Sequence, residues 1–241
     1  MIHKALILAA GKGTRMGELT QATPKPMLLV QGKPILEHIM SGLRDEAGID
    51  EFFIVIGYQG HFIQNYFGDG SRFGVSITYG TQTVQDGTGK APELAQTWIG
   101  KDPFLFTYGD ILIAAPEYKN FVEAFCGEGV IALKEGQDLK NGGAVLLDDQ
   151  DQMIDLIEKG QFQTPPPNAF YNAGIYALTP RIFEYTATLQ KSPRGEYEFT
   201  DALKAFAQAG GKIKGHKIKS DWVDVRDPGI LSQLNTIQKH L

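Results

Sequence analysis

A glycine-rich loop with two nearby cations is the first place in the chain where chemistry could occur. The continuous apolar run from Ala5 to Ala10 leads into Gly-Lys-Gly-Thr-Arg-Met-Gly at residues 11–17, and Thr-Pro-Lys-Pro-Met follows at residues 23–27. A glycine loop at the carboxyl end of a first parallel strand is a common binding place for phosphorylated ligands. Arg15 and Lys25 would flank a polyphosphate held by backbone N–H groups of the loop.

The spacing of this loop disfavours two other phosphate-binding motifs. The dinucleotide motif G-x-G-x-x-G requires glycine where the chain has Met16, and it requires an immediate helix that Pro24 would interrupt. The P-loop motif requires Ser or Thr after Lys90, where the chain has Ala91. The mismatch with the dinucleotide motif at Met16 and Pro24 also disfavours a nicotinamide-dependent oxidoreductase. Prolines on both sides of Lys25 predict an extended, stiff segment that presents its ammonium group.

The elements that must position these residues alternate between strands and helices in the first half of the chain. This alternation predicts βαβ units around a parallel sheet. After about residue 142 strand-like runs follow one another without long helices between them, which predicts antiparallel pairing and a lobe. The predicted strands are Ala5–Ala10, Phe52–Ile56, Val75–Tyr79, Phe104–Tyr108, Val130–Leu133, Ala144–Leu147, Met153–Ile157 and Tyr171–Leu178, and the predicted helices are Ile35–Arg44, His61–Phe67, Glu93–Ile99, Tyr118–Phe125, Pro180–Leu189, Phe199–Gln208 and Gly229–His240.

Composition and charge narrow the range of partners. The 241 residues include 23 Lys and Arg against 28 Asp and Glu, a net charge of −5 at pH 7, which argues against a general nucleic-acid binder. Residues 1–33 nevertheless hold five basic residues and one acidic residue, and anion binding depends on such local charge. Cys126 is the single cysteine, and the apolar run near the N-terminus is too short for a membrane span or a signal-peptide core. We expect a cytoplasmic protein without a membrane partner.

At this point a family resemblance becomes specific. The residues from Leu8 to Met16, then Pro24–Met27 and Gly32–Leu36, closely resemble the start of the sugar-1-phosphate nucleotidyltransferases, also called nucleotide-sugar pyrophosphorylases. The resemblance extends over nearly the whole chain. It implies a Rossmann-like three-layer α/β/α fold of the nucleotide-diphospho-sugar transferase type, with a mainly parallel mixed central sheet and a small sugar-binding lobe.

The resemblance also implies how the chain is divided. It implies one nucleotidyltransferase domain over residues 1–241, and the 17 residues after Asp224 would suffice for one closing helix and no further domain. A homo-oligomer is compatible with this organisation. The parts of the domain would be a nucleotide-binding part at 1–141, a sugar-binding lobe at 142–220, and a metal-ligand strand end with the closing helix at 221–241.

The implied reaction joins a nucleoside triphosphate to a sugar 1-phosphate and releases pyrophosphate. Arg15 would bind the pyrophosphate leaving group and Lys25 the α-phosphate. Asp110, at the tip of a predicted strand, is placed to hold a hard cation, and the resemblance implies that it shares Mg²⁺ with Asp224. The implied nucleotide-binding residues are Leu8, Ala10, Gly11, Gly13, Thr14, Gln82, Gly87 and Thr88, and the implied sugar-phosphate-binding residues are Gly143, Glu158, Lys159 and Asn172.

Some positions depart from the family pattern or leave the function open. Lys90 stands where the family has a small residue, and Arg226 and Asp227 stand where it often has Gly and Thr. Segment Glu196–Asp201 resembles one that opens a late helix, with either a structural or a site role. Other motifs resemble glucose-1-phosphate cytidylyl-, thymidylyl- and uridylyl-transferring relatives and favour a pyrimidine nucleotide. A catalytically silent regulatory homologue and a Mg²⁺-dependent glycosyltransferase remain the alternatives.

Overall fold

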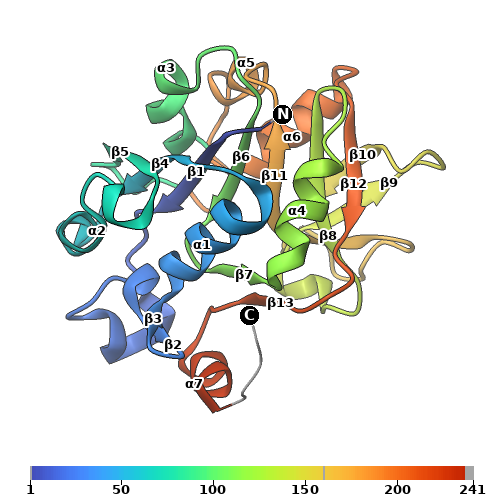
Figure 1. The fold of residues 1–241 in the computed structure, drawn as a ribbon. Coiled ribbons are helices and arrows are strands. Elements are labelled where there is room, and N and C mark those ends of the chain that lie inside the picture. The colour runs from blue at the N-terminus through green and yellow to red at the C-terminus, as the bar shows by residue number, and fades with distance from the viewer. Residues whose placement is uncertain (1, 160, 237–241) are drawn as a thin grey trace.

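One branched β-sheet organises the chain (Figure 1). In the computed structural model, which describes residues 2–159 and 161–236, nine of the described strands belong to this sheet. Its main path runs β10-β9-β11-β6-β1-β4-β5, and β8 pairs with both β11 and β12. The strands are β1 (Lys4–Ala9), β4 (Glu51–Ile56), β5 (Ser76–Thr81), β6 (Phe104–Tyr108), β8 (Gly129–Lys134), β9 (Ala144–Leu147), β10 (Met153–Ile157), β11 (Phe170–Leu178) and β12 (Ile213–Lys217).

The sheet is parallel from β6 to β5 and mixed on the other side, where β12 runs parallel to β8. Strand β1 lies between β4 and β6 and runs parallel to both, so that Lys4 pairs with Glu51 on one side and Phe104 on the other. Strand β11 then runs antiparallel to β6, β8 and β9. The predicted parallel sheet, and the antiparallel pairing expected after residue 142, are both confirmed, within one shared sheet.

Helices cover both faces and enclose two cores. Alternate residues of β1 point to opposite faces, so that Ile7 packs in one core and Leu6 in the other. Helices α1 and α4 close the first core, and α5 and α6 close the second. This is the expected three-layer α/β/α arrangement. The helices are α1 (Ile35–Ala47), α2 (Gly60–Phe67), α3 (Gln96–Ile99), α4 (Ala115–Glu123), α5 (Ile182–Thr186), α6 (Phe199–Gln208) and α7 (Pro228–Thr236).

Two small strand pairs lie beside the main sheet. Strand β2 (Leu29–Val30) pairs with β3 (Lys33–Pro34), and β7 (Ile111–Ile113) pairs antiparallel with β13 (Trp222–Asp224). The sequence analysis did not predict β2, β3, β7 or β12, and for β13 it gave only a strand end within residues 221–241. Each has two to five residues, too few for a readable periodicity, and each is fixed by its partner.

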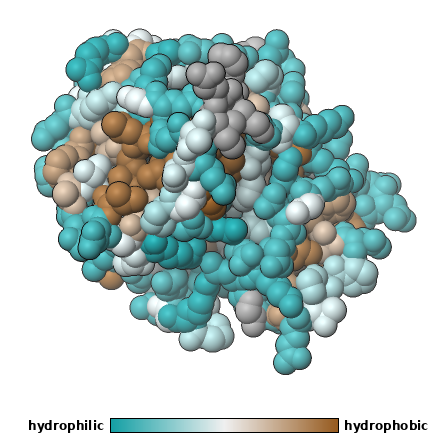
Figure 2. All heavy atoms as spheres, turned by 90° about the horizontal axis from the view of Figure 1, so that it is seen from below, coloured by the Kyte–Doolittle hydropathy of each residue, from teal (hydrophilic) through white to brown (hydrophobic). Residues whose placement is uncertain are grey.

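Three predicted helices differ from the observed ones, and of these Pro180–Leu189 is shortened to α5 (Ile182–Thr186). Glu93–Ile99 forms a 3₁₀ helix over Ala91–Ala95 followed by the single turn of α3. The closing helix begins at Pro228 and is described to Thr236, so the rest of the predicted Gly229–His240 lies outside the described residues. The face seen in Figure 2 is largely hydrophilic, with apolar residues grouped at one side. Across residues 2–159 and 161–236, none of the helices combines the length and apolarity that crossing a bilayer requires.

The contact between α1 and α4 yields a stability prediction. A Cβ built on Gly42 of α1 would overlap the ring of the buried Tyr118 of α4. Gly42→Ala is therefore expected to lower the free energy of unfolding by about 1–3 kcal/mol, measured in urea, despite alanine's better helix propensity. Ser41→Ala, one residue away, is the control and should change it by no more than about 0.5 kcal/mol. Equal stability of the two variants would contradict this packing.

Candidate active site

A cavity of about 540 Å³ opens where the carboxyl ends of β1 and β6 meet the mixed side of the sheet. Every site residue named in the sequence analysis lines this cavity, although some are more than 200 residues apart in the chain. The carboxyl edge of parallel strands is the expected place for a ligand in an α/β protein. The residues concerned are Leu8, Ala10, Gly11, Gly13, Thr14, Arg15, Lys25, Gln82, Gly87, Thr88, Asp110, Gly143, Glu158, Lys159, Asn172 and Asp224.

The glycine loop packs against the segment that carries Lys25. Gly13 has a φ of 63°, and a Cβ on it would lie 3.0 Å from the Cβ of Lys25. The hydroxyl of Thr20 donates to the carbonyl of Gly13 at 3.0 Å and holds the turn that follows, the 3₁₀ helix Thr14–Thr20. A Cβ on Gly11, in contrast, would meet no atom within 4 Å. The loop thus leaves open space in the cavity beside Gly11.

Lys25 is presented differently from the prediction. Pro24 is extended, with φ −65° and ψ 146°, but Lys25–Met27 forms a 3₁₀ turn, so the expectation of extended backbone at Lys25 is wrong. Pro26 fits the first turn because no N–H is needed there. The N–H of Met27 donates to Pro24 O at 2.8 Å and closes the turn. The Lys25 ammonium group reaches the Asp110 carboxylate, with 2.5 Å between Nζ and Oδ2.

A short strand pair brings Asp110 and Asp224 together. Asp110 lies between β6 and β7, and the pairing of β7 with β13 places Asp224 opposite Ile111. The N–H of Val225 also donates to the backbone carbonyl of Asp110 at 3.0 Å. Burial raises the pKa of Asp224 to about 6, with the negative charge of Asp110 adding to the effect and Lys25 opposing it.

The two carboxylates suit a magnesium ion whose other ligands come from water and substrate phosphates. Mg²⁺ in nucleotide enzymes is usually held by one or two carboxylates, with water and substrate phosphates completing the shell. A cation would stabilise the half-buried Asp224, on which the negative charge of Asp110 acts. Within residues 2–159 and 161–236 we find no cluster of three or more His, Cys, Asp or Glu side chains that could hold a metal ion. Asp110 and Asp224 are two carboxylates that could hold such an ion together with ligands from water and substrate.

The segment from Gln82 to Thr88, which carries implied nucleotide-binding residues, is hydrogen-bonded to the segment that precedes and opens α6. Gly87 has a φ of 115° and pairs with Tyr197, and a Cβ on it would lie 2.7 Å from the backbone nitrogen of Tyr197. The hydroxyl of Thr88 accepts a hydrogen bond from the N–H of Phe199 at 3.2 Å, at the first residue of α6. Gln82 donates from its side-chain amide to the Gly87 carbonyl at 3.0 Å. Gln82 and Thr88 therefore support the segment as well as lining the cavity.

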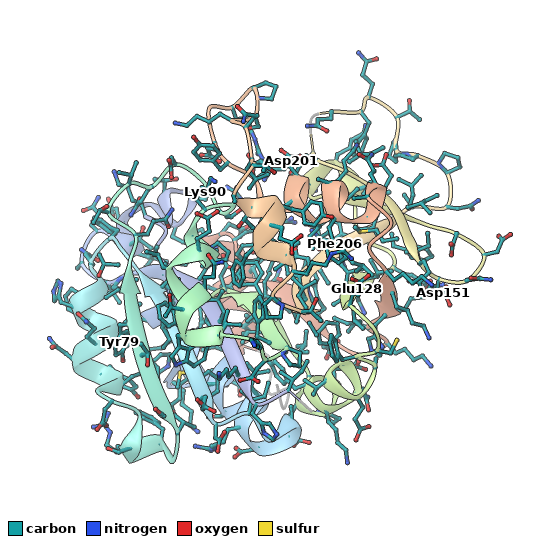
Figure 3. The ribbon with its side chains drawn as sticks, turned by 90° about the horizontal axis from the view of Figure 1, so that it is seen from above. Tyr79, Lys90, Glu128, Asp151, Asp201 and Phe206 are labelled. Carbon is teal, nitrogen blue, oxygen red and sulfur yellow. The ribbon has the colours of Figure 1, made fainter. Side chains whose placement is uncertain are left out.

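Lys90 does not point into the cavity. Its ammonium group donates to the carbonyl of Ala187 at 2.9 Å and pairs with Glu93 at 3.3 Å. It also lies 5.7 Å from the ring centroid of Tyr197. Figure 3 shows Lys90 on the same side of the view as Asp201 and apart from Tyr79. Lys90, which departs from the family pattern, therefore links neighbouring segments. Gly87 and Thr88 line the cavity in this part of the chain.

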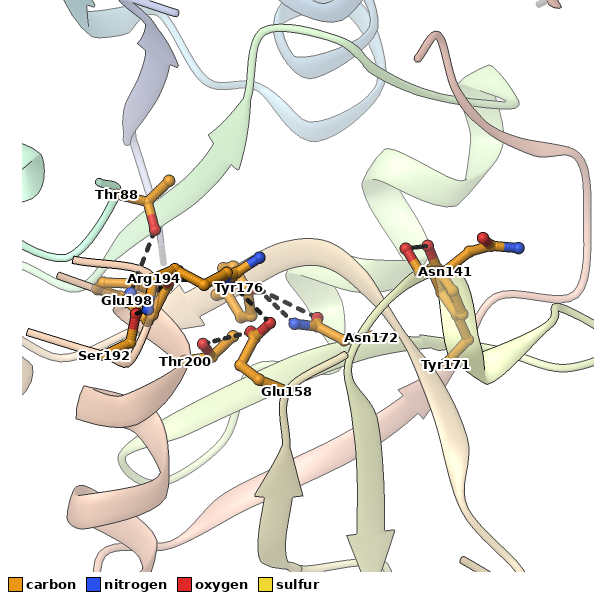
Figure 4. Close-up of polar contacts among 11 residues, drawn as sticks. Thr88, Asn141, Glu158, Tyr171, Asn172, Tyr176, Ser192, Arg194, Glu198 and Thr200 are labelled. Carbon is orange, nitrogen blue, oxygen red and sulfur yellow. Dashed lines mark hydrogen bonds and ion pairs between the residues drawn. The ribbon is translucent and has the colours of Figure 1, made fainter. Parts of the chain in front are cut away.

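The sugar-side residues are held by a polar network (Figure 4). Thr200 donates from its hydroxyl to Glu158 Oε1 at 2.5 Å. The Asn172 side chain contacts the Tyr176 hydroxyl at 2.9 Å, and its Oδ1 accepts from the N–H of Gly174 at 3.1 Å. A bulge in β11 at this point gives Gly174 a φ of 76°. The orientation of Glu158 and Asn172 is therefore fixed by the protein itself.

The sequence analysis gave several cavity residues no individual site role. Trp222 donates from its indole N–H to Ala173 O at 2.8 Å, and its ring stands edge-on to Tyr171 at 5.3 Å, forming an aromatic wall. Burial raises the pKa of Tyr176, whose ring stacks on Phe106. The position of Tyr108 at the end of a buried strand was a usable signal, whereas the contacts of the others depend on tertiary pairing. Lining residues to which the sequence analysis gave no individual site role include Gln85, Tyr108, Tyr171, Tyr176 and Trp222, and Thr200 lies in Glu196–Asp201, for which a site role was left open.

The chain is similar to one protein family and to several curated proteins over most of its length. The family model described as nucleotidyl transferase matches residues 4–239. The bifunctional protein GlmU of Methanococcus maripaludis (strain C7) is 37% identical over 224 residues, 93% of this chain and 51% of that protein. The low-salt glycan biosynthesis nucleotidyltransferase Agl11 of Haloferax volcanii is 33% identical, over 97% of this chain and 65% of its own. The chain thus spans about half to two thirds of the length of these relatives.

Solved structures show the same fold. A putative glucose-1-phosphate thymidylyltransferase from Bacillus anthracis, in complex with a sucrose, superposes with a TM-score of 0.84 at 25% identity, covering 97% of this chain and 94% of that one. A UDP-glucose pyrophosphorylase complexed with UDP-glucose superposes with a TM-score of 0.85 at 23% identity, covering 98% of both chains. The second similarity concerns the fold alone.

The half-buried carboxylate pair of Asp110 and Asp224 predicts a gain in stability on removal of one charge. The pKa of folded Asp224, about 6, lies above its ordinary value of 3.8, so its ionised form destabilises the folded state above pH 6. Without divalent cations, Asp224→Asn should raise the free energy of unfolding at pH 8 by on the order of 2 kcal/mol. The gain should shrink as the pH falls through about 6.

Urea unfolding at several pH values in EDTA measures this effect. Asp149→Asn, on an exposed turn, serves as the control and should shift stability by no more than about 0.5 kcal/mol at any of these pH values. A less stable Asp224→Asn protein at pH 8, or a gain that does not vary with pH, would show that the two carboxylates do not repel each other.

Proposed function

The chain belongs to the nucleotidyl transferase family, and we propose that it transfers a nucleotidyl group from a nucleoside triphosphate to a sugar 1-phosphate. The observation that carries the proposal is the cavity itself. At one end the glycine loop and Lys25 meet Asp110 and Asp224, and at the other end lie Glu158 and Lys159. A triphosphate and a phosphorylated polyol would both find complementary groups in one cavity. The products would be a nucleotide-sugar and pyrophosphate.

The reaction depends on neutralising the negative charge of the phosphates more than on acid–base catalysis. An oxygen of the sugar phosphate attacks the α-phosphorus and forms a new P–O bond. The bond from the α-phosphorus to its bridging oxygen breaks, and pyrophosphate leaves with that oxygen and its electron pair. The attacking oxygen is already anionic near neutral pH, so no general base has to remove a proton.

Bringing two polyanions together is the main barrier. One pair of like charges at 4 Å costs about 4 kcal/mol at an effective dielectric constant of 20. Arg15 would neutralise the departing pyrophosphate, Lys25 the α-phosphate, and Lys159 the sugar phosphate. The ion pair of Lys25 with Asp110 holds the ammonium group at the tip of β6 before any ligand binds. The positive charge of Lys25 is thereby held in place where negative charge would accumulate on the phosphates during the reaction.

A magnesium ion fits this arrangement. Asp110 and Asp224 would hold it, and a bound ion would neutralise phosphate charge and orient the phosphate oxygens. Its binding would also relieve the repulsion that raises the pKa of Asp224. The protein's own part is to keep both carboxylates in place through the pairing of β7 with β13.

The two substrates would approach from different parts of the chain. Residues 1–141 supply the glycine loop, Lys25 and Asp110, and residues 142–220 supply Glu158, Lys159 and Asn172. The sequence motifs favour a pyrimidine nucleotide, in line with the thymidylyltransferase among the similar proteins. The carboxylate of Glu158 and the amide of Asn172 suit the hydroxyls of a hexose 1-phosphate.

Removing the ammonium group of Lys25 should affect turnover and leave the fold intact. Lys25→Ala is expected to lower kcat/KM by about 10²–10³-fold, because a preorganised cation at the reacting phosphate is lost. Thermal unfolding should remain cooperative. Lys119→Ala is the matched control, since Lys119 is an exposed lysine that pairs with Glu123 at 3.9 Å on the outer helix α4. Near-normal turnover in Lys25→Ala would remove Lys25 from the site.

Pyrophosphate release tests the proposed function directly. The protein with Mg²⁺ should release pyrophosphate from one nucleoside triphosphate only when the matching sugar 1-phosphate is present. The assay covers ATP, GTP, CTP, UTP and dTTP against several hexose 1-phosphates, with a nucleotide-sugar and a sugar acceptor as the glycosyltransferase control. Silence over the whole grid would reject the proposed function.

A further inference from the structure

Behind Glu158 lies a buried carboxylate that the proposed reaction does not use. The side chain of Glu198 is 8% exposed, and this residue precedes the first turn of α6. It does not line the cavity, whereas its neighbour Thr200, two residues later, does. Burying an ionised carboxylate is costly unless it is paired. The question is what this carboxylate holds in place.

Glu198 holds the guanidinium group of Arg194, which in turn contacts Glu158 (Figure 4). Arg194 Nη2 lies 2.8 Å from Glu198 Oε1 and 3.5 Å from Glu158 Oε2. One guanidinium nitrogen therefore bridges two carboxylates. The other oxygen of Glu158, Oε1, accepts the short hydrogen bond from Thr200. Both oxygens of Glu158 are thus held from behind, and the carboxylate cannot rotate without breaking one of these contacts.

The loop before α6 fixes the position of Glu198 itself. Ser192 donates from its hydroxyl to Glu198 Oε1 at 3.1 Å, and the N–H of Arg194 donates to the same hydroxyl oxygen at 3.3 Å. The N–H of Ser192 donates to the carbonyl of Glu196 at 2.8 Å and closes the loop. Burial raises the pKa of Glu198, and the positive charge of Arg194 opposes this rise. Arg194 is therefore the cation on which this buried carboxylate relies.

We propose that Glu198 is a positioning residue for the sugar subsite, acting through Arg194 to fix the orientation of Glu158. The inference rests on the proposed function, in which Glu158 receives the hydroxyls of the sugar 1-phosphate. With both oxygens fixed, the remaining lone pairs of Glu158 point into the cavity before the sugar arrives. Without Glu198, Arg194 loses its strongest partner, and Glu158 loses the restraint on one oxygen.

The charge-removing variant Glu198→Gln tests the first part of this proposal. Its KM for the sugar 1-phosphate should rise about tenfold, as expected for loss of a hydrogen bond between charged groups, while its KM for the nucleotide stays within about twofold. Glu128→Gln is the matched control, because Glu128 also pairs with an arginine, Arg181, and does not line the cavity. It should change neither KM.

A double-mutant cycle with Glu158→Gln separates positioning from a general effect on structure. Once the carboxylate of Glu158 is gone, adding Glu198→Gln should change the KM for the sugar 1-phosphate by less than about twofold. If Glu198→Gln does not fold, Arg194→Gln replaces it in the same cycle, and the same non-additivity is expected.

Additive effects in the cycle, or an equal rise in both KM values, would overturn the positioning role. So would an unchanged KM for the sugar 1-phosphate in the folded Glu198→Gln protein. A wild-type protein that releases no pyrophosphate with any substrate pair would instead overturn the proposed function, and this inference with it. The two failures are therefore distinguishable in the same set of assays.

Discussion

The confinement of Asp110 and Asp224 at one edge of the sheet is the constraint on which the rest of the site depends. Strands β7 and β13 hold the two aspartates together, and burial with mutual repulsion raises the pKa of Asp224 to about 6. Lys25 lies against Asp110 and offsets part of that repulsion. A protein selected for stability alone would not keep two carboxylates in this arrangement. The burial of apolar side chains in the two cores around the sheet offsets this cost.

The backbone around Asp110 and Asp224 is tightly packed and leaves little room for a side chain at Gly109. A Cβ on Gly109 would lie 3.2 Å from the carbonyl oxygen of Leu8 and 3.3 Å from the ring of Pro26, so β6, β1 and the lysine segment meet at one point. At the opposite side of the cavity, Thr88 receives the first N–H of α6 and Thr200 of the same helix holds Glu158. Nucleotide-side and sugar-side residues are therefore both hydrogen-bonded to the first residues of α6.

Local patterns were sufficient to predict the first strand, the glycine loop and the alternation of strands and helices. Those features depend on residues close together in sequence, such as the buried run that ends at Ala10. The conformation of Lys25 and the direction of Lys90 were not predictable, because each depends on a distant partner: Asp110 for one and Ala187 for the other. Strands β7 and β13 are short enough that only their pairing defines them. The contact between Glu158 and Arg194 likewise joins two loops that no local pattern connects.

The most direct test of nucleotidyl transfer follows individual oxygen atoms through the reaction. A sugar 1-phosphate labelled with ¹⁸O in its three non-bridging phosphate oxygens is incubated with the matching nucleoside triphosphate and Mg²⁺, and the products are resolved by ³¹P NMR. Attack of the sugar phosphate on the α-phosphorus places all three labels on the sugar-linked phosphorus, one of them in the new diphosphate bridge, and releases unlabelled pyrophosphate. Label in the pyrophosphate, or a labelled sugar phosphate that remains unreacted while the triphosphate is consumed, would contradict the account.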